Sequence, residues 1–281
     1  MNKLLSLSLI LTFLSLIGCT QVDIGGVTRV VQQTFEAARP LSDEEEYYVG
    51  RSVAARILSS YSLLQNQELT EYVNLVGNTV ALNSDKPYTY GGYHFAILNS
   101  KEINAFACPG GTIFITKGMI NAVRNEDELA AVLAHEVAHV NHRDGVSAIQ
   151  KARLTAVAAL IGTQAAQRYT PAQLSQLVTA FEGSIDDVFK TLVVNGYGKS
   201  QEYHADEGAI SYLTRAGYNP SALKDFLQRL VSEGGASGGG IMKSHPATAG
   251  RIEKVEKNLS KEKADPSLVQ LRARRFEKAL K

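Results

Sequence analysis

Residues 129–144, LAAVLAHEVAHVNHRD, constrain this chain more than any other stretch. Their apolar residues recur at helical spacing, which predicts a helix with one side in a core. Within that helix His135 and His139 are four residues apart, so both imidazoles lie on one face and can bind the same metal ion. Glu136 lies about 100° further round, where its carboxylate can take a proton from a water on that metal. The pattern is typical of zinc hydrolases, which need a further ligand from elsewhere in the chain.

The composition is that of a globular protein with ample length for a hydrophobic core. Of 281 residues, 44% are hydrophobic and 20% are charged, which argues against a disordered chain. The formal net charge is +1 and no basic stripe stands out, so we expect no nucleic-acid partner. The two cysteines, Cys19 and Cys108, lie far apart in the sequence and provide no disulfide framework.

The N-terminus predicts a targeting segment. After a short positive start, residues 4–17 form an apolar run that is too short for a membrane span of about 20 residues. The run ends in the sequence LIGC, which resembles a bacterial lipobox. We therefore expect a signal peptide at 1–18, a lipid anchor on Cys19 and a tether over 19–40; plain secretory cleavage is the alternative. Thr20, rather than an aspartate, follows the cysteine, which favours the outer membrane facing the periplasm of a Gram-negative cell.

Two helices and a small sheet are predicted before the motif. One helix begins at Ser42, which is followed by acidic residues suited to a first turn, and another covers 69–82. Three short β-prone runs follow, at 93–98, 104–108 and 112–116. We expect a sheet of about three strands, with one edge that binds an extended peptide by strand addition. The candidate substrate-binding residues on that edge are Asn104, Ala105 and Phe106.

The region after the motif predicts further helices. Residues 146–198 read as a helical excursion beside the motif helix, with a membrane-dipping hairpin as the alternative. A helix over 199–216 carries Glu202 and Asp206 four residues apart on one face, either toward the core or as a solvated acidic face. A glycine-rich loop then leads to Ser244-His245-Pro246 and a helix with Arg251. From Pro266 a basic amphipathic helix either packs on the domain or contacts an anionic membrane.

Four blocks in this order carry a family resemblance: the strand and turn at 104–111, HEVAH at 135–139, QEYHAD at 201–206 and SHPATAGRI at 244–252. They resemble the gluzincin metallopeptidase family that includes HtpX and the CAAX prenyl proteases, and within it the periplasmic lipoprotein and BepA-like branch. The resemblance implies a mostly α-helical α+β domain of the zincin type with a small sheet. It also implies endopeptidase activity and one zinc ion held by His135, His139 and Glu202.

The resemblance assigns further roles. Glu136 would activate the water, and Asp206 would orient a ligand imidazole. His245 or Arg251 is placed by its motif to stabilise the oxyanion. The glycine-rich loop before His245 indicates mobility, which raises a second hypothesis independent of the resemblance: in a resting state this imidazole becomes a fourth zinc ligand. Two features depart from the family: Gly198-Lys199 stands where many relatives have an arginine, and the helical repeats that follow in BepA-like relatives are not expected here.

These observations lead to one prediction and one alternative. We expect a single catalytic domain over 41–281 that is a zinc-dependent endopeptidase for misfolded or unassembled envelope proteins. It would be tethered in the bacterial envelope through Cys19, with polypeptide substrates and possible envelope assembly partners. The alternative is a non-enzymatic envelope chaperone or assembly factor on the same fold, which would have no need of Glu136 as a base.

Overall fold

A computed structural model describes residues 40–147, 183, 185–234, 240–246, 248–259 and 266–281. The signal peptide expected at 1–18, Cys19, nearly all of the tether and most of the excursion expected at 146–198 lie outside these residues. Among the helices of the described ranges, none combines the length and the apolar content that a bilayer crossing requires.

Two capped helices open the domain. Helix α3 (Asp43–Leu58) begins at Ser42, whose side chain and that of Glu45 form a reciprocal capping box. Helix α4 (Gln67–Leu82) begins two residues before the position expected from the sequence, because the Asn66 side chain accepts the Leu69 N–H and fixes the first turn there.

The sheet has three strands, β1 (His94–Leu98), β2 (Ala105–Ala107) and β3 (Thr112–Thr116), in the order β1-β3-β2. Strand β3 lies in the centre, parallel to β1 and antiparallel to β2. A short 3₁₀ turn, η2 (Pro109–Gly111), connects β2 to β3. The expected three-stranded sheet is thereby confirmed, and β2 is an edge strand.

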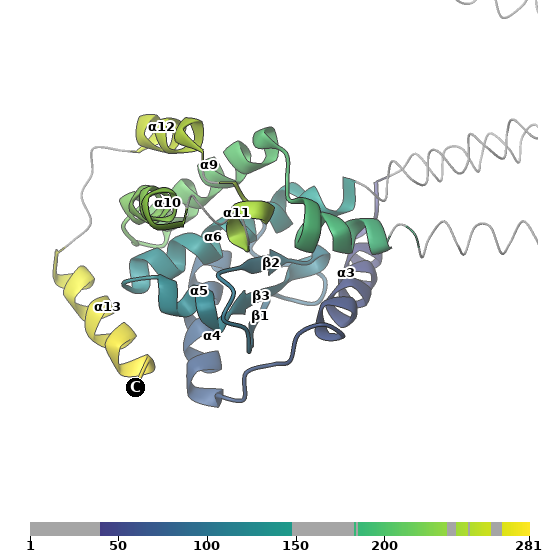
Figure 1. Cartoon of the computed structure of the whole chain (residues 1–281), viewed down its shortest axis with the longest axis horizontal. Helices are drawn as coiled ribbons and strands as arrows, with labels where there is room; N and C mark the ends of the chain where they lie inside the picture. Colours follow the sequence, from purple (N-terminus) through teal and green to yellow (C-terminus); the bar gives the residue numbers. More distant parts are fainter. Residues whose placement is uncertain (1–39, 148–182, 184, 235–239, 247, 260–265) are drawn as a thin grey trace, which may run out of the picture.

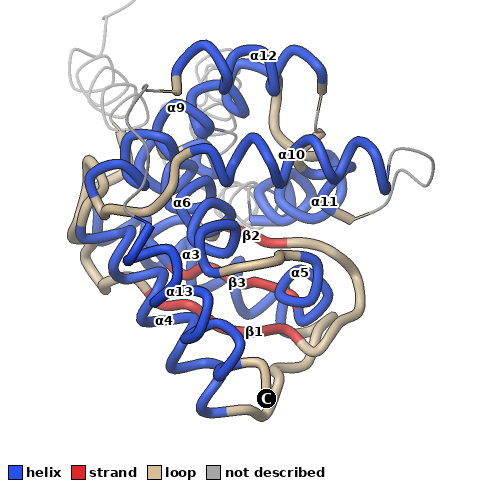
Figure 2. Tube along the Cα trace, turned by 90° about the vertical axis from the view of Figure 1, so that its left-hand side faces the viewer, coloured by secondary structure: helices blue, strands red, loops and turns tan. Residues whose placement is uncertain are grey.

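Helix α6 (Glu126–His142) carries the histidine motif and is the centre of the fold. It follows the short helix α5 (Lys117–Ala122), and Asn125 caps it by accepting the Glu128 N–H. It lies between the sheet and the helices α9 (Lys199–Arg215) and α10 (Ser221–Gly234), as Figures 1 and 2 show. Fifteen of its 17 residues are buried, so its position is fixed from every side.

The remaining elements close the domain around α6. They are the turns η3 (Asp144–Val146) and η4 (Thr191–Asn195) and the helices α11 (Ile241–Ser244), α12 (Ala249–Asn258) and α13 (Pro266–Ala279). Helix α12 packs on α9 and α10, whereas α13 returns to α6 and α4 (Figure 1). The basic amphipathic helix from Pro266 therefore packs on the domain, which was the first of its two expected placements.

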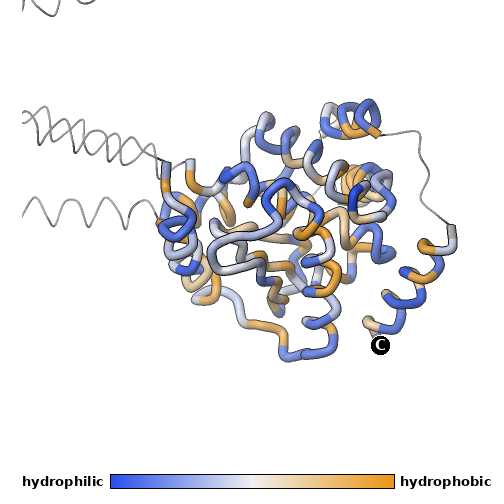
Figure 3. Tube along the Cα trace, turned by 180° about the vertical axis from the view of Figure 1, so that it is seen from behind, coloured by the Kyte–Doolittle hydropathy of each residue, from blue (hydrophilic) through white to orange (hydrophobic). Residues whose placement is uncertain are grey.

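The hydrophobic core has two parts on opposite faces of the sheet. The larger one joins α4, β1 and α6 to α9, α10 and α13, and the smaller one lies under α3 and includes Phe106 and Phe114. In Figure 3 hydrophobic and hydrophilic stretches alternate along the trace of these elements. The structure confirms the expected class, a mostly helical α+β domain with a small mixed sheet.

Candidate metal centre and active site

Four side chains from three parts of the chain converge at the middle of the domain. Helix α6 provides His135 and His139, α9 provides Glu202, and His245 follows directly after α11. One ligand atom from each lies within 4.8 Å of all the others, and all four residues are buried. Chain segments more than 100 residues apart thus build one cluster of metal-binding groups.

The spacing of these atoms fits a single zinc ion. Nε2 of His135 lies 3.1 Å from Nε2 of His139 and 3.3 Å from Nδ1 of His245, and the latter lies 3.0 Å from Oε1 of Glu202. A tetrahedral zinc with ligand bonds of about 2.0–2.1 Å has edges of roughly 3.3–3.4 Å. Three imidazoles and one carboxylate are also the donors that zinc prefers.

Each imidazole on α6 has its own carboxylate on the nitrogen that faces away from the cluster. Nδ1 of His135 lies 3.0 Å from Oδ1 of Asp206, and Nδ1 of His139 lies 2.7 Å from Oδ2 of Asp144. Such contacts fix the ring and leave Nε2 as the ligand atom. Burial opposes the charge on Asp144, but the hydrogen bond with His139 lowers its pKa below the ordinary value.

Asp206 was predicted from the sequence and Asp144 was not. Asp144 lies just beyond the C-terminal end of α6, where Arg143 takes the left-handed conformation (φ 59°, ψ 33°) and turns the chain back. The available signal was an aspartate five residues after His139, within the motif stretch itself.

Arg251 holds the carboxylates of the centre in place. Its Nε and Nη2 donate to the two oxygens of Asp206 at 2.8 and 2.7 Å, and its Nη1 lies 2.6 Å from Oε2 of Glu202. Burial opposes the charge on Asp206, but the guanidinium lowers the pKa of that carboxyl below its ordinary value. In this arrangement all three guanidinium nitrogens contact protein oxygens, so Arg251 orients one ligand directly and His135 through Asp206.

Glu136 lies against the cluster and is fully buried. Its Oε1 is 3.7 Å from Nε2 of His245, and neither of its oxygens accepts a hydrogen bond from another described residue. A buried carboxylate without a hydrogen-bond donor is costly, which indicates a group whose partner comes from outside the protein. A water or a substrate amide would be such a partner.

Tyr197, a residue that the sequence analysis missed, fixes the other side of His139. The two rings stack with centroids 4.0 Å apart, and the Tyr197 N–H donates to the Ser244 carbonyl. Burial, together with the charges of Glu136 and Asp144, raises the pKa of the phenol well above its ordinary value. Only the three-dimensional structure brings this ring to His139.

The expected substrate edge lies beside the metal centre. The Asn104 side chain accepts hydrogen bonds from the Ser244 hydroxyl and from the Ala105 N–H, and the Ile103 carbonyl accepts the Ile241 N–H. The Phe106 side chain is buried in the smaller core. The structure thus places Asn104 beside the segment that carries His245, whereas the Phe106 side chain packs in the core. Cys19 lies outside the described residues.

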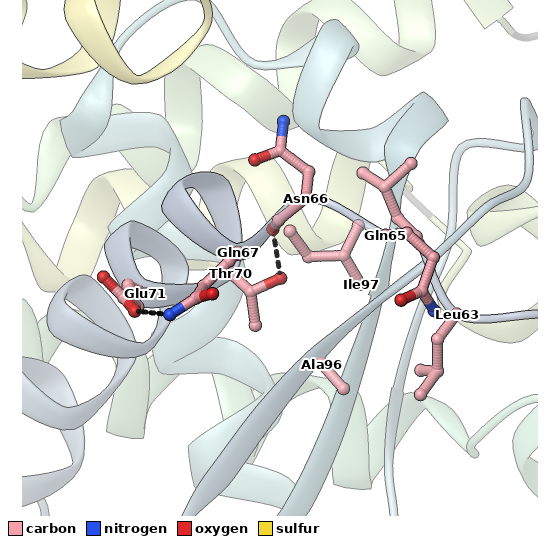
Figure 4. A pocket seen from close by; sticks show the side chains of 9 residues that line it. Leu63, Gln65, Asn66, Gln67, Thr70, Glu71, Ala96 and Ile97 are labelled. Atoms are coloured by element: carbon pink, nitrogen blue, oxygen red, sulfur yellow. Dashed lines mark hydrogen bonds between the residues drawn. The ribbon is translucent and has the colours of Figure 1, made fainter.

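A cavity of about 440 Å³ lies at the β1 edge of the sheet, between β1 and the start of α4 (Figure 4). Amide, hydroxyl and aliphatic groups line it, together with one carboxylate, Glu71, which accepts a hydrogen bond from Gln67. Its lining contains neither histidine nor cysteine, in contrast to the ligand cluster of α6 and α9.

A buried set of zinc ligands beside a carboxylate that accepts no hydrogen bond from a described residue is the arrangement expected of a zinc-dependent hydrolase. Comparison with known protein families agrees with this class, since residues 66–259 match Peptidase family M48. The chain belongs to this family. The expected family is thereby confirmed, and the cluster of three imidazoles and one carboxylate fits the single zinc ion expected from the sequence.

Characterised proteases of bacteria are similar to this chain in sequence. The β-barrel assembly-enhancing protease of Yersinia pestis is 30% identical over 197 residues, which are 70% of this chain and 40% of that protein. Its counterpart in Escherichia coli K12 is 27% identical over 218 residues, 77% of this chain and 44% of that protein. The metalloprotease LoiP of E. coli K12 is 24% identical over 254 residues, 87% of this chain and 92% of LoiP. The chain therefore spans less than half the length of the first two relatives.

Proposed function

We propose that this protein is a zinc-dependent endopeptidase that cleaves misfolded or unassembled proteins of a bacterial cell envelope. The observation that supports the activity most directly is Glu136, a buried carboxylate that accepts no hydrogen bond from any described residue and lies beside a set of zinc ligands. The names of the relatives, which refer to the assembly of β-barrels, support envelope proteins as substrates.

The roles of the residues follow from their positions. When bound, zinc supplies a Lewis acid that activates water and polarises the scissile carbonyl. Glu136 takes the proton of the attacking water and passes it to the leaving amine. His135, His139 and Glu202 are the protein ligands of the active state, held by the carboxylates and the guanidinium around them.

The outer edge of β2 suits an extended peptide. Asn104 and Cys108 hydrogen-bond to β3 through Thr116 and Thr112. Because the direction of backbone groups alternates along a strand, Ile103, Ala105 and Ala107 point theirs away from β3. A substrate strand can add to this row and lie across the metal centre. The backbone, rather than the side chains of Asn104 and Phe106, is the recognition element here.

His245 regulates access in this proposal. Catalytic zinc sites keep one position open, whereas four protein ligands close the coordination shell. The geometry with His245 inside the ligand cluster therefore represents a resting state. Movement of the segment that carries His245 would open the site, and the released imidazole, which lies near Glu136, could then donate to the oxyanion.

The location proposed for the enzyme derives from the N-terminal sequence. Residues 1–18 would be removed as a signal peptide, and Cys19 would carry lipid that anchors the single domain of 41–281 to the outer membrane, facing the periplasm. Labelling of the protein with a radioactive or clickable fatty acid in cells, with Cys19→Ser as the control, tests this anchor: unlabelled wild-type protein would contradict it.

The activity is tested with the purified full-length chain, zinc and a fluorescently labelled unfolded protein. We expect cleavage that a chelator abolishes and that Glu136→Gln loses while its zinc content is unchanged. Glu277→Gln, at an exposed position on α13, is the matched control and should cleave normally. Wild-type rates in Glu136→Gln would overturn the mechanism. Prevention of aggregation without cleavage by the zinc-loaded wild type would favour the non-enzymatic chaperone instead.

A further inference from the structure

Exposed aromatic side chains gather at one corner of the domain. In the described ranges three aromatic side chains are exposed, Tyr48, Tyr88 and Tyr90, at 54%, 76% and 56%. Tyr48 lies in α3, whereas Tyr88 and Tyr90 lie in the loop that leads to β1. Tyr47 joins them, because its ring centroid lies 5.3 Å from that of Tyr48 and 5.5 Å from that of Tyr90. These four residues, here called the tyrosine surface, indicate a binding surface, since aromatic residues are enriched where proteins bind partners.

The rings of the tyrosine surface are held in place. The Tyr90 hydroxyl donates to Oε1 of Glu44 at 3.2 Å, and the Arg51 guanidinium lies over the Tyr47 ring, 5.7 Å from its centroid. Gly91 allows the Tyr47 ring to lie directly on the loop, since a Cβ at Gly91 would be 2.2 Å from a ring carbon. Rings that are fixed in this way lose little conformational entropy when a partner binds, so they provide contact area at low cost.

The turn η2 separates the tyrosine surface from the metal centre. On one side Gly110 packs on the backbone of α3, where a Cβ on Gly110 would lie 2.7 Å from Cα of Tyr47. On the other side Pro109 packs on Gly145, which directly follows Asp144 of the metal centre; a Cβ on Gly145 would lie 3.2 Å from Cγ of Pro109. The same turn follows β2, whose outer edge is the proposed peptide edge. A polypeptide that leaves the metal centre past the C-terminal end of β2 therefore crosses η2 and then meets the tyrosine surface.

The charges around the tyrosine surface favour a polypeptide over a lipid bilayer. Nζ of Lys86 lies 2.7 Å from Oδ1 of Asp43, and Arg51 lies over the Tyr47 ring, so both cations are already engaged. The exposed Glu44 adds a negative charge, so anionic lipid headgroups would gain little from this surface. Aromatic and aliphatic side chains of an unfolded polypeptide would instead pack on the phenol rings, and its basic side chains would approach Glu44.

We propose that the tyrosine surface is a second binding site for the substrate polypeptide, separate from the peptide edge at β2. It binds an extended segment with aromatic, aliphatic or basic side chains that lies several residues away from the scissile bond. The inference rests on the proposed endopeptidase activity and adds a preference for long unfolded chains over short peptides, because only a long chain contacts both sites at once.

The dependence of cleavage on substrate length tests this second site. One peptide is the cleaved segment alone, about eight residues that span roughly 25 Å when extended, and two others carry an apolar and basic extension of about 15 residues on one side or the other. The full-length zinc-loaded protein should cleave one of the extended peptides with a KM about tenfold below that of the short peptide. A triple variant should raise the KM for this extended peptide about tenfold and leave kcat and both constants for the short peptide unchanged. It carries Tyr48→Ala, Tyr88→Ala and Tyr90→Ala.

Matched variants separate the tyrosine surface from general effects of truncation. A second triple variant with Phe at the same three positions keeps the aromatic rings and should keep most of the preference for the extended peptide. Leu75→Ala in α4 and Leu271→Ala in α13 shorten side chains that are 54% and 49% exposed elsewhere, and should change no kinetic constant. Equal KM values for all three peptides in the wild type would overturn the proposal. So would a folded alanine variant in which the short and the extended peptide lose the same factor.

A binding measurement keeps the second site separate from the activity. The sequence contains no tryptophan, so Tyr88→Trp places a single fluorescent reporter on the tyrosine surface. In zinc-loaded protein that also carries Glu136→Gln, a tryptophan-free extended peptide should shift the emission to shorter wavelength, and the short peptide should not. This shift supports the site even if the wild type cleaves nothing. Unchanged emission, or no binding of either extended peptide, would refute the site even if cleavage is observed.

Other occupants of the tyrosine surface give different results with the same proteins. Vesicles of phosphatidylethanolamine and phosphatidylglycerol that shift the emission of the Tyr88→Trp reporter, while the extended peptides do not, would assign the surface to a bilayer. A wild-type dimer that the triple alanine variant converts to a monomer, with kinetics that do not depend on substrate length, would assign it to a second copy of the chain. Either result would overturn the polypeptide site.

Discussion

Both halves of helix α6 bury polar and charged side chains, but the two halves differ in the partners that these side chains have. The first turn buries Glu126, Asp127 and Glu128, and the second half buries His135, Glu136 and His139. At the first end every carboxylate has a cation and a hydrogen bond within the protein. At the other end the imidazoles turn one nitrogen toward a shared cluster, and no described residue donates a hydrogen bond to Glu136.

The N-terminal end of α6 is closed by three arginines. Arg275 of α13 binds Glu126, which also accepts hydrogen bonds from the hydroxyls of Tyr72 and Tyr218. The other two pairs are Arg272 with Asp127 and Arg229 with Glu128. Carboxylates also suit the positive end of the helix dipole. This end is complete without a ligand and holds the axial position of α6.

The second half of α6 is complete only with a group from outside. Three imidazoles and one carboxylate converge on positions that suit one shared cation, and Glu136 accepts no hydrogen bond from a described residue. The lesson of the comparison is that burial of charge does not by itself mark a functional site. What distinguishes the two ends is whether the protein supplies the partner.

The largest effect is expected at Glu136. Glu136→Leu should abolish cleavage, with a loss of about a thousandfold or more, because the proton acceptor is removed. The chelated protein should nevertheless become more stable, by about 1–3 kcal/mol, because an unpartnered buried carboxylate disappears. Chemical denaturation with excess chelator measures this. A less stable variant would contradict the contrast between the two ends.

A loss of stability, rather than a gain, is expected when Arg229 is replaced. Its side chain is 9% exposed and forms an ion pair with Glu128. Arg229→Leu leaves the Glu128 carboxylate buried without its cation and should cost about 3 kcal/mol of unfolding free energy. Its zinc content should be normal, since the pair lies at the other end of α6. The double variant Arg229→Leu with Glu128→Leu should recover most of the loss, because no uncompensated charge remains. Lack of recovery would assign the loss to packing instead.

The contrast also shows what the sequence could predict. The site residues in the second half of α6 could be predicted from the sequence, because the spacing i and i+4 determines which side chains share a face of a helix. The same rule applied to Glu202 and Asp206. The arginine partners of the first turn could not be predicted, because Glu126 and Arg275 are 149 residues apart in the sequence and an acidic first turn is ordinarily exposed. Local patterns predict faces of helices, whereas partners from distant segments require the packing.

Arg251 illustrates the same limit. Its block predicted a place near the active site, and the structure puts it there. Its expected part in oxyanion stabilisation depended on which atoms it contacts, and these are Asp206, Glu202 and the His245 carbonyl. A sequence motif gives proximity, and the assignment of a donor to an acceptor needs coordinates.

An effect of intermediate size, on zinc affinity, is expected at Asp144. Asp144→Asn should weaken zinc binding by about 10–100-fold, because the acceptor that orients His139 loses its charge. Competition with a zinc-sensitive dye measures the affinity. Asp43→Asn, at an exposed position on α3, is the control and should bind zinc as the wild type does. An unchanged affinity in Asp144→Asn would show that Tyr197 alone fixes the ring.

The smallest effect on stability is expected at an ion pair near the surface, Lys86 with Asp43, whose Nζ and Oδ1 lie 2.7 Å apart. It serves as the reference for the buried ion pairs. The hydrogen bond from Lys86 lowers the pKa of Asp43 in the folded protein. The pair therefore stabilises the protein above the unfolded pKa of about 3.9, and the contribution is lost as the pH falls through the folded value. Lys86→Ala should cost less than about 1 kcal/mol at pH 7, because water screens the pair, and nothing once Asp43 is protonated. Urea unfolding of both proteins at pH 7 and at a series of acidic pH values measures the difference and its decline. A loss at pH 7 as large as that of Arg229→Leu would mean that burial does not set the strength of the ion pairs around α6.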